Sequence, residues 1–85
     1  MSETHSNYLR DLGNLLREAA VDARRRHQEA AGSENESFEA GRSMAYYEVV
    51  SLLIDQAVAF EIPTEVLGLS GFDPDRDLLS GTSTQ

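Results

Sequence analysis

The sequence predicts an all-α fold, an antiparallel hairpin of two long helices followed by one or two short C-terminal helical turns. Between Leu9 and Ala30, apolar residues recur at alternating spacings of three and four, which is typical of an amphipathic helix, and a second long segment is apolar over most of its residues. Gly32 and Ser33 separate these segments and indicate a tight turn between antiparallel helices. With 85 residues, the chain is expected to form one domain over residues 1–79. Residues 80–85 are small and polar and are expected to be a disordered tail.

The first helix is expected over residues 4–31. Gly32 should end it as a left-handed residue, and Ser33 with Glu36 three residues later matches a capping box that opens the next helix. The stripe of the first helix that should pack on the second follows Leu9, Leu12, Leu16, Ala19, Ala23, Arg26 and Ala30, and Tyr8, Leu15, Ala20 and His27 widen it.

The second helix is expected over residues 34–61, and its apolar arc covers more than half of its circumference. At about 100° per residue, only Glu48, Ser51 and Asp55 form a narrow polar strip. A helix on one partner needs an apolar stripe of roughly 100°, so the first helix cannot cover this one alone. We therefore expect a homodimer, a four-helix bundle with twofold symmetry. The expected dimer or partner interface is Tyr46, Tyr47, Val50, Leu53, Ile54, Ala57 and Phe60.

Folding the hairpin about residues 32–33 also predicts which residues of the two helices meet. Small residues would face each other near the turn and large ones at the open end, so the helices should splay towards the termini. Gly41 costs about 1 kcal/mol in a helix interior relative to alanine, and close backbone contact would explain it. The expected pairs are Ala23 with Gly41, Ala19 and Ala20 with Ala45, Leu16 with Val49, and Leu12 with Leu52 and Leu53.

The C-terminal segment, residues 63–79, is expected to add short helical turns. Pro63 suits the first turn of a short helix that Gly68 ends, and Asp73 before a proline suits the N-cap of another. Four apolar residues could fold back over the splayed end of the hairpin, namely Ile62, Leu67, Leu69 and Phe72.

Charge is distributed unevenly along the chain. The formal net charge is −8, and residues 33–85 carry all of it, because residues 1–32 hold five arginines and five acids. All seven basic residues are arginines, which together with the many alanines and glycines suggests a GC-rich bacterial or phage source. A dimer with this charge would favour basic partners and accelerate their encounter.

No motif predicts a metal site or a cofactor. The chain has no cysteine, and His5 and His27 match no zinc spacing. The carboxylates of residues 73–77 have the one-three-five spacing of a calcium loop. That loop needs glycine at its sixth position and glutamate at its twelfth, where this chain has Leu78 and Thr84.

The most apolar stretch, Met44 to Phe60, is expected to be a core helix. It is short for a membrane span and contains Glu48 and Asp55, which would cost several kcal/mol each in lipid. The amino terminus has no positive region followed by an apolar run, so no secretory signal is predicted and the expected location is the cytoplasm.

Catalysis is not expected either. Glu48 and Asp55 share one strip but lie about 10 Å apart along the helix axis, with no histidine placed to assist them. The sequence contains no glycine-rich phosphate loop. The chain is therefore predicted not to be an enzyme and to need no cofactor.

The leading functional hypothesis is a non-enzymatic protein–protein interaction module, for example an accessory or inhibitor protein that docks on a basic surface. The alternative is an RNA-binding dimeric bundle that uses Arg10, Arg17 and Arg24, which lie at seven-residue intervals, together with Arg25. The acidic balance of the chain argues against nucleic acid, because nucleic-acid-binding proteins usually carry a basic excess.

Overall fold

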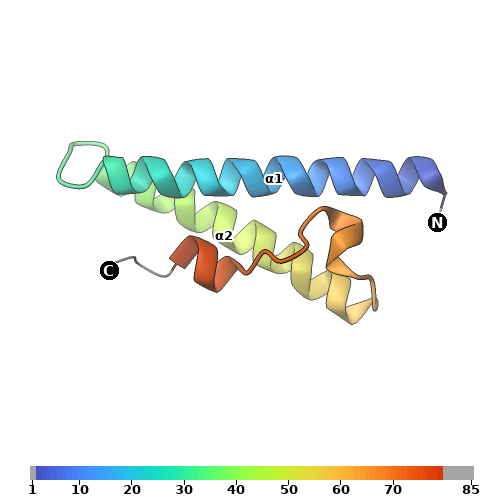
Figure 1. Cartoon of the computed structure of the whole chain (residues 1–85). Coiled ribbons are helices and arrows are strands. Elements are labelled where there is room, and N and C mark those ends of the chain that lie inside the picture. Colours follow the sequence, from blue (N-terminus) through green and yellow to red (C-terminus); the bar gives the residue numbers. More distant parts are fainter. Residues whose placement is uncertain (1, 80–85) are drawn as a thin grey trace.

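The computed structural model describes residues 2–79 and is helical wherever it is regular (Figure 1). Two long helices, α1 (Glu3–Glu29) and α2 (Glu36–Ala59), pack against each other. They are followed by a 3₁₀ turn, η1 (Thr64–Leu67), and a π-helical turn, η2 (Asp75–Leu79). The predicted all-α hairpin with short C-terminal turns is confirmed. The tail predicted for residues 80–85 lies outside the described residues.

Both ends of α1 have the polar groups that a helix end needs. The Ser2 side chain caps the amino end by accepting a hydrogen bond from the backbone N–H of His5 at 3.2 Å. Glu3 lies in the first turn, and Arg26 and His27 lie in the last. These charges oppose the helix dipole at both ends, which favours a long uninterrupted helix.

The connection between the helices is longer than expected, and the predicted capping box is wrong. Gly32 is left-handed, as predicted, with φ of 81°. The Ser33 hydroxyl donates to the carbonyl of Ala30 at 2.7 Å and accepts from the backbone N–H of Asn35 at 3.2 Å. The Glu36 carboxylate accepts from the backbone N–H of Gly32 at 3.2 Å. Both side chains thus satisfy backbone groups of the turn, and α2 begins at Glu36 with no side-chain cap.

The carboxyl end of α2 is a Schellman motif with a glutamate in the position that favours glycine. The N–H of Ile62 donates to the carbonyl of Ala57 at 2.8 Å, and the N–H of Glu61 donates to that of Val58 at 3.0 Å. Glu61 is left-handed, with φ of 58°, and is the one non-glycine residue with positive φ in the described chain. The motif ends α2 and turns the chain back towards the hairpin.

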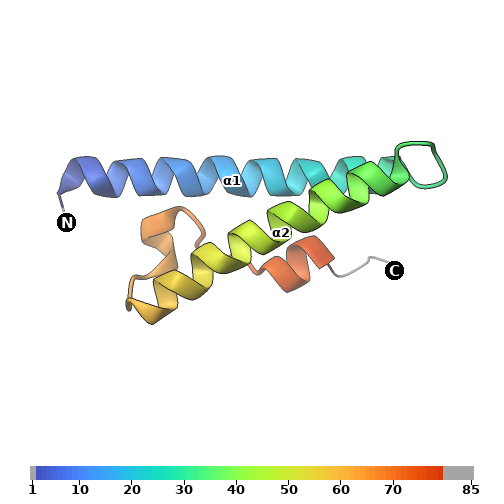
Figure 2. The same cartoon turned by 180° about the vertical axis from the view of Figure 1, so that it is seen from behind.

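The segment after α2, residues 62–79, forms a third layer on the hairpin, and we call it the strap. The two helices lie close together beside the connecting turn and diverge towards the other end (Figure 1). The strap returns along the diverging pair, and η1 and η2 each contact both helices. Viewed from behind, α2 is in front and the strap lies beyond it (Figure 2). The predicted splay therefore exists, and the strap occupies it.

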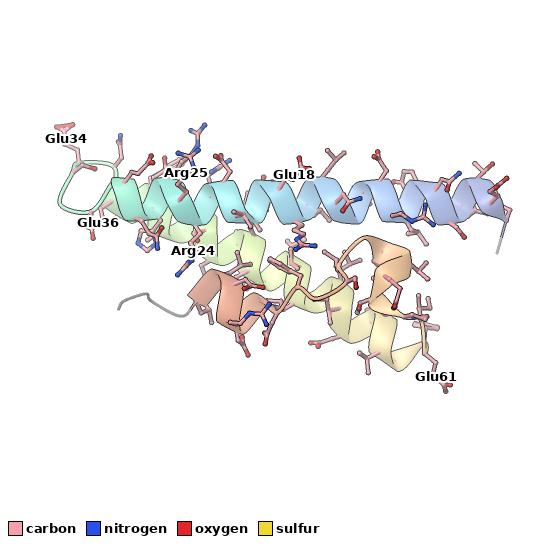
Figure 3. The ribbon with its side chains drawn as sticks, viewed as in Figure 1. Glu18, Arg24, Arg25, Glu34, Glu36 and Glu61 are labelled. Carbon is pink, nitrogen blue, oxygen red and sulfur yellow. The ribbon has the colours of Figure 1, made fainter. Side chains whose placement is uncertain are left out.

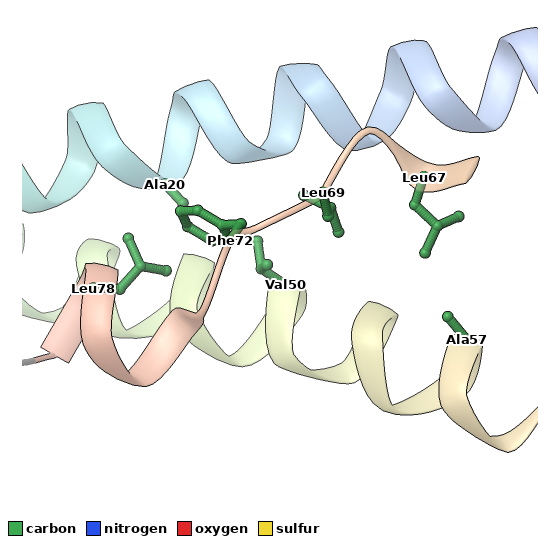
Figure 4. Packing of buried hydrophobic residues seen from close by; sticks show 7 residues of the cluster. All are labelled: Ala20, Val50, Ala57, Leu67, Leu69, Phe72 and Leu78. Atoms are coloured by element: carbon green, nitrogen blue, oxygen red, sulfur yellow. The ribbon is translucent and has the colours of Figure 1, made fainter. Parts of the chain in front are cut away.

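The strap contributes much of the hydrophobic core. The buried side chains of the two helices are mostly small, whereas those of the strap are large, and together they line the space between α1 and α2 (Figure 4). Leu69 is completely buried, and burying a leucine contributes about 1.5–3 kcal/mol. The buried apolar residues of the helices are Ala20, Ala23, Val50 and Ala57, and those of the strap are Leu67, Leu69, Phe72 and Leu78.

The rotation of α2 about its axis differs from the prediction. The buried residues of α2 are Ser43, Val50 and Ala57, spaced by seven. The predicted contacts Ala45, Val49 and Leu52 are exposed, so the expected pairing is wrong by about one residue, or 100°. The physical reason is the strap, because α2 has to pack against α1 and the strap together.

The close backbone contact also lies elsewhere. A Cβ built at Gly41 would meet nothing within 4 Å, so the expected reason for that glycine is wrong. A Cβ at Gly13 of α1 would lie 1.6 Å from the carbonyl oxygen of Leu67. A Cβ at Gly68, which is left-handed, would lie 2.7 Å from the carbonyl oxygen of Arg10. The strap therefore packs backbone to backbone on α1 where glycines permit it.

Candidate interaction surface

The two sides of the hairpin differ, because the strap covers only one of them. We measured the direction of each side chain at about 100° per residue from the buried Ala20 in α1 and the buried Val50 in α2. Most of the exposed large apolar residues lie on one rotational side of each helix, and Val21, Met44 and Val58 lie on the other. Arg17 and Tyr47, which contact the strap, lie on the opposite rotational side. Because the helices are antiparallel, side chains that are rotated in the same sense from the buried direction of each helix point to the same side of the helix pair.

This uncovered side carries a set of exposed apolar residues on both helices, which we call the open face. Leu15 is 55% exposed and Leu52 is 62% exposed, although both are large aliphatic side chains. Exposed apolar residues that gather on one side of a molecule mark an interaction site more often than isolated exposed leucines do. The open face comprises Tyr8, Leu12 and Leu15 of α1, and Phe38, Ala45, Val49, Leu52 and Phe60 of α2 and its carboxyl end.

A pocket of about 160 Å³ lies where the open face meets the diverging end of the hairpin. Gln56 provides the only polar side chain among the residues that line it. Ile62 and Leu67 of the strap contribute to it, so the pocket depends on the strap being in place. Its other lining residues are Leu9, Leu53, Ala57 and Phe60.

The structure divides the interface that the sequence predicted. Val50 is completely buried in the chain's own core, so the prediction is corrected for it, and Ala57 is 4% exposed and contributes only to the wall of the pocket. The other expected residues of α2 pack partly against the same core, namely Tyr46, Tyr47, Leu53 and Ile54. Phe60 is 73% exposed and stays in the candidate surface.

The sequence prediction placed Tyr8, Leu12 and Leu15 of α1 in the contact with α2, and the structure leaves them exposed. These three residues have spacings of four and three and form a second stripe beside the buried one. Two apolar stripes on one helix indicate two partners. The prediction merged them because it assumed that α2 alone covers α1.

The strap side carries a specific polar contact. The Tyr47 hydroxyl donates to a carboxylate oxygen of Asp75 at 2.6 Å. This hydrogen bond to an anion, together with burial, raises the pKa of Tyr47 above its usual value of 10. The contact joins the middle of α2 to η2. Ser51, Ile54, Asp55 and Pro74 line a shallow hollow of about 220 Å³ beside it.

The arginines proposed for nucleic acid lie on the strap side of α1 or pair with acids. The Arg17 guanidinium lies 5.0 Å from the ring centre of Phe72, a cation–π contact that fixes the strap. Arg25 pairs with Asp22 and with Glu29, and the hydrogen bond from Arg25 lowers the pKa of Asp22. Arg24 lines a hollow between α1 and η2, whereas Arg25 projects outward (Figure 3). Arg10 donates to the Asn7 side chain at 3.4 Å.

The carboxylates of Asp73 and Asp77 make hydrogen bonds and an ion pair within the acidic segment of residues 73–77 itself. The Asp73 carboxylate accepts from the backbone N–H groups of Asp75 and Arg76, as an N-cap does. The Asp77 carboxylate accepts from the Asp73 N–H at 2.9 Å and pairs with Arg76 at 2.8 Å, and Arg76 lowers its pKa. Within residues 2–79, no three histidine, cysteine or acidic side chains are grouped closely enough to hold a metal ion.

The described helices include none that is both long and apolar enough to cross a membrane. Comparison of the chain with protein-family models, with curated proteins and with solved structures finds no match.

Proposed function

We propose that this chain is a non-enzymatic protein–protein interaction module of bacterial or phage origin. In this proposal the open face pairs with a second copy, and two hairpins form a four-helix bundle. The observation that supports the proposal is the apolar surface shared by α1 and α2 on the side that the strap leaves uncovered. Pairing of two such faces removes the apolar surface of both copies from water.

The molecule is large enough to offer a dimer interface of standard size. The Cα atoms extend over 47 × 22 × 16 Å, so the outline of the molecule along its two longer axes is about 1,000 Å². A standard protein–protein interface buries about 800 Å² per partner. Small domains also have thin cores, which oligomerisation supplements.

In such a dimer, the acidic side chains of both copies stay on the solvent-exposed surface. Exposed carboxylates lie on the strap and at its junction with α2, namely Glu61, Glu65, Asp73 and Asp75. Pairing through the open face leaves these groups in solvent, on the outer sides of the bundle. A dimer with about twice the formal charge of −8 favours basic protein partners, and salt weakens such attraction.

Light scattering coupled to size exclusion tests the pairing. The expected mass at tens of micromolar is twice the 9.4 kDa of the chain. Leu52→Asp on the open face should give a monomer, because it places a charge in the interface. Val58→Asp is the matched control, since Val58 is 66% exposed on the strap side of the same helix.

The same comparison is available in α1. Leu15→Asp on the open face should also give a monomer, and Val21→Asp on the strap side should stay dimeric. Circular dichroism at 222 nm checks that every variant stays helical. A wild-type chain that remains monomeric would overturn the proposal, as would variants of the two sides that dissociate equally.

Binding of an arginine-rich peptide tests the role of the acidic surface. Glu61→Gln with Glu65→Gln removes two exposed carboxylates and should weaken binding at low salt. Glu3→Gln with Glu18→Gln removes the same charge from α1 and is the control. Equal losses in the two variants would show that net charge alone acts, without a preferred surface.

A further inference from the structure

We propose that α2 packs antiparallel against α2 of the second copy, with the twofold axis beside Val49 and with Phe38 of each copy seated in the apolar pocket of the other. This inference rests on the dimer proposed above and specifies its arrangement. Three features of α2 carry it, namely the spacing of its exposed apolar residues, the size of the pocket and the position of its polar residues.

The spacing on α2 is symmetric about Val49. Phe38 and Phe60 are each eleven residues from Val49, or about 16 Å along the helix axis. Eleven residues are three turns with a drift of only about 20°, so the three side chains lie on one stripe. Phe38 is 69% exposed and Phe60 is 73% exposed. A twofold axis at Val49 therefore places Phe38 of one copy beside Phe60 of the other.

Phe60 is also a wall of the apolar pocket at the diverging end of the hairpin. The pocket volume is about 160 Å³. A cavity of about 150 Å³ with similar apolar walls accepts benzene, so a phenyl ring is a suitable occupant. Phe38 of the second copy reaches this position by the symmetry alone. In this arrangement the exposed Phe38 ring of each copy is buried and fills the apolar pocket of the other copy.

The same register also pairs residues of α2 beside the stripe of Phe38, Val49 and Phe60, by size and by polarity. Ala45 comes opposite Leu53, a small residue against a large one. Arg42 comes opposite Gln56, whose side-chain carbonyl can accept a hydrogen bond from a guanidinium. Within the described chain, the buried Nη1 atom of Arg42 lies 3.9 Å from Glu39 Oε1, and the guanidinium lies 5.4 Å from the ring centre of Tyr46. The Arg42 side chain is still 32% exposed, so its other N–H groups can donate to Gln56 of the second copy.

Cysteine cross-linking tests the register directly, because the chain has no cysteine of its own. In a Val49→Cys variant, the two new thiols would face each other across the axis, within the 7 Å between Cα atoms that a disulfide needs. Air oxidation should convert this variant to a covalent dimer, whereas Val58→Cys on the strap side should cross-link no faster than free collision allows. Equal cross-linking of the two variants would overturn the register.

Substitution of Phe38 tests the pocket. Phe38→Ala should raise the dimer dissociation constant at least tenfold in sedimentation equilibrium, and Val58→Ala should leave it unchanged. Phe38 is exposed, so the substitution should preserve the helical circular dichroism signal of the monomer. A wild-type monomer would refute the dimer itself. A wild-type dimer whose dissociation constant is the same with Phe38→Ala would refute only the arrangement proposed here.

Discussion

The contact between α1 and the strap predicts an unusual response to alanine at Gly13. In an exposed helix, replacement of glycine by alanine stabilises the fold by about 1 kcal/mol. At Gly13 the new Cβ would lie 1.6 Å from the carbonyl oxygen of Leu67, whereas an ordinary contact is 3.4–4 Å. The obstacle is backbone, so no side-chain rotation can relieve it. The strap has to retreat from α1 or detach.

The two responses give the magnitude. Overpacking in a core costs about 1–3 kcal/mol, and more where backbone has to move. Complete detachment exposes Leu67, Leu69, Phe72 and Leu78, each of which contributes about 1.5–3 kcal/mol when buried. A small displacement of the strap away from α1 costs less free energy than its complete detachment, so we expect the displacement. After the intrinsic gain of alanine, we expect a net loss of about 2 kcal/mol, or about 10 °C in Tm for a domain of this size.

Urea denaturation followed by circular dichroism measures the effect, at one protein concentration for all variants because association shifts apparent stability. Gly41→Ala is the matched control, since a Cβ there meets nothing within 4 Å and α2 should gain about 1 kcal/mol. The two glycine-to-alanine substitutions therefore have opposite expected signs. Stabilisation by Gly13→Ala equal to that by Gly41→Ala would refute the backbone contact between α1 and the strap.

Two further predictions concern the ends of the strap. Glu61→Gly should stabilise the chain by about 0.5–1 kcal/mol in urea denaturation, because glycine accepts the left-handed backbone without strain. Glu61→Ala removes the same carboxylate but keeps a Cβ, so an equal gain from it would contradict the backbone explanation. The second prediction concerns pH. The pKa of Tyr47 is raised in the folded state, so its contribution is complete below pH 10 and is lost as the pH rises through the raised value. Thermal unfolding from pH 9 to 11.5 should show a loss that Tyr47→Phe lacks, with no lysine titrating in that range, and parallel curves would contradict it.

The positions of the elements could be predicted from the sequence because they depend on local patterns. The apolar spacing of three and four predicted α1, and the long apolar segment after the turn predicted α2. The observed ends, at Glu3–Glu29 and Glu36–Ala59, lie within two residues of the expected ones. Gly32 marked the turn through its backbone preference, which needs no tertiary contact. The charge is a property of composition, and so is the acidity of the surface that we propose for partners.

The tertiary structure decided which sides of the helices are buried. The apolar arc of α2 exceeds half its circumference, so several rotations of the helix bury similar areas and the spacing alone cannot choose among them. The strap makes the choice, because Leu69 and Phe72 enter between the diverging helices from one side. That contact joins residues far apart in the chain and depends on the missing side chain of Gly13, which no local pattern marks. The candidate surface follows from it, since the open face is the apolar surface that the strap leaves uncovered.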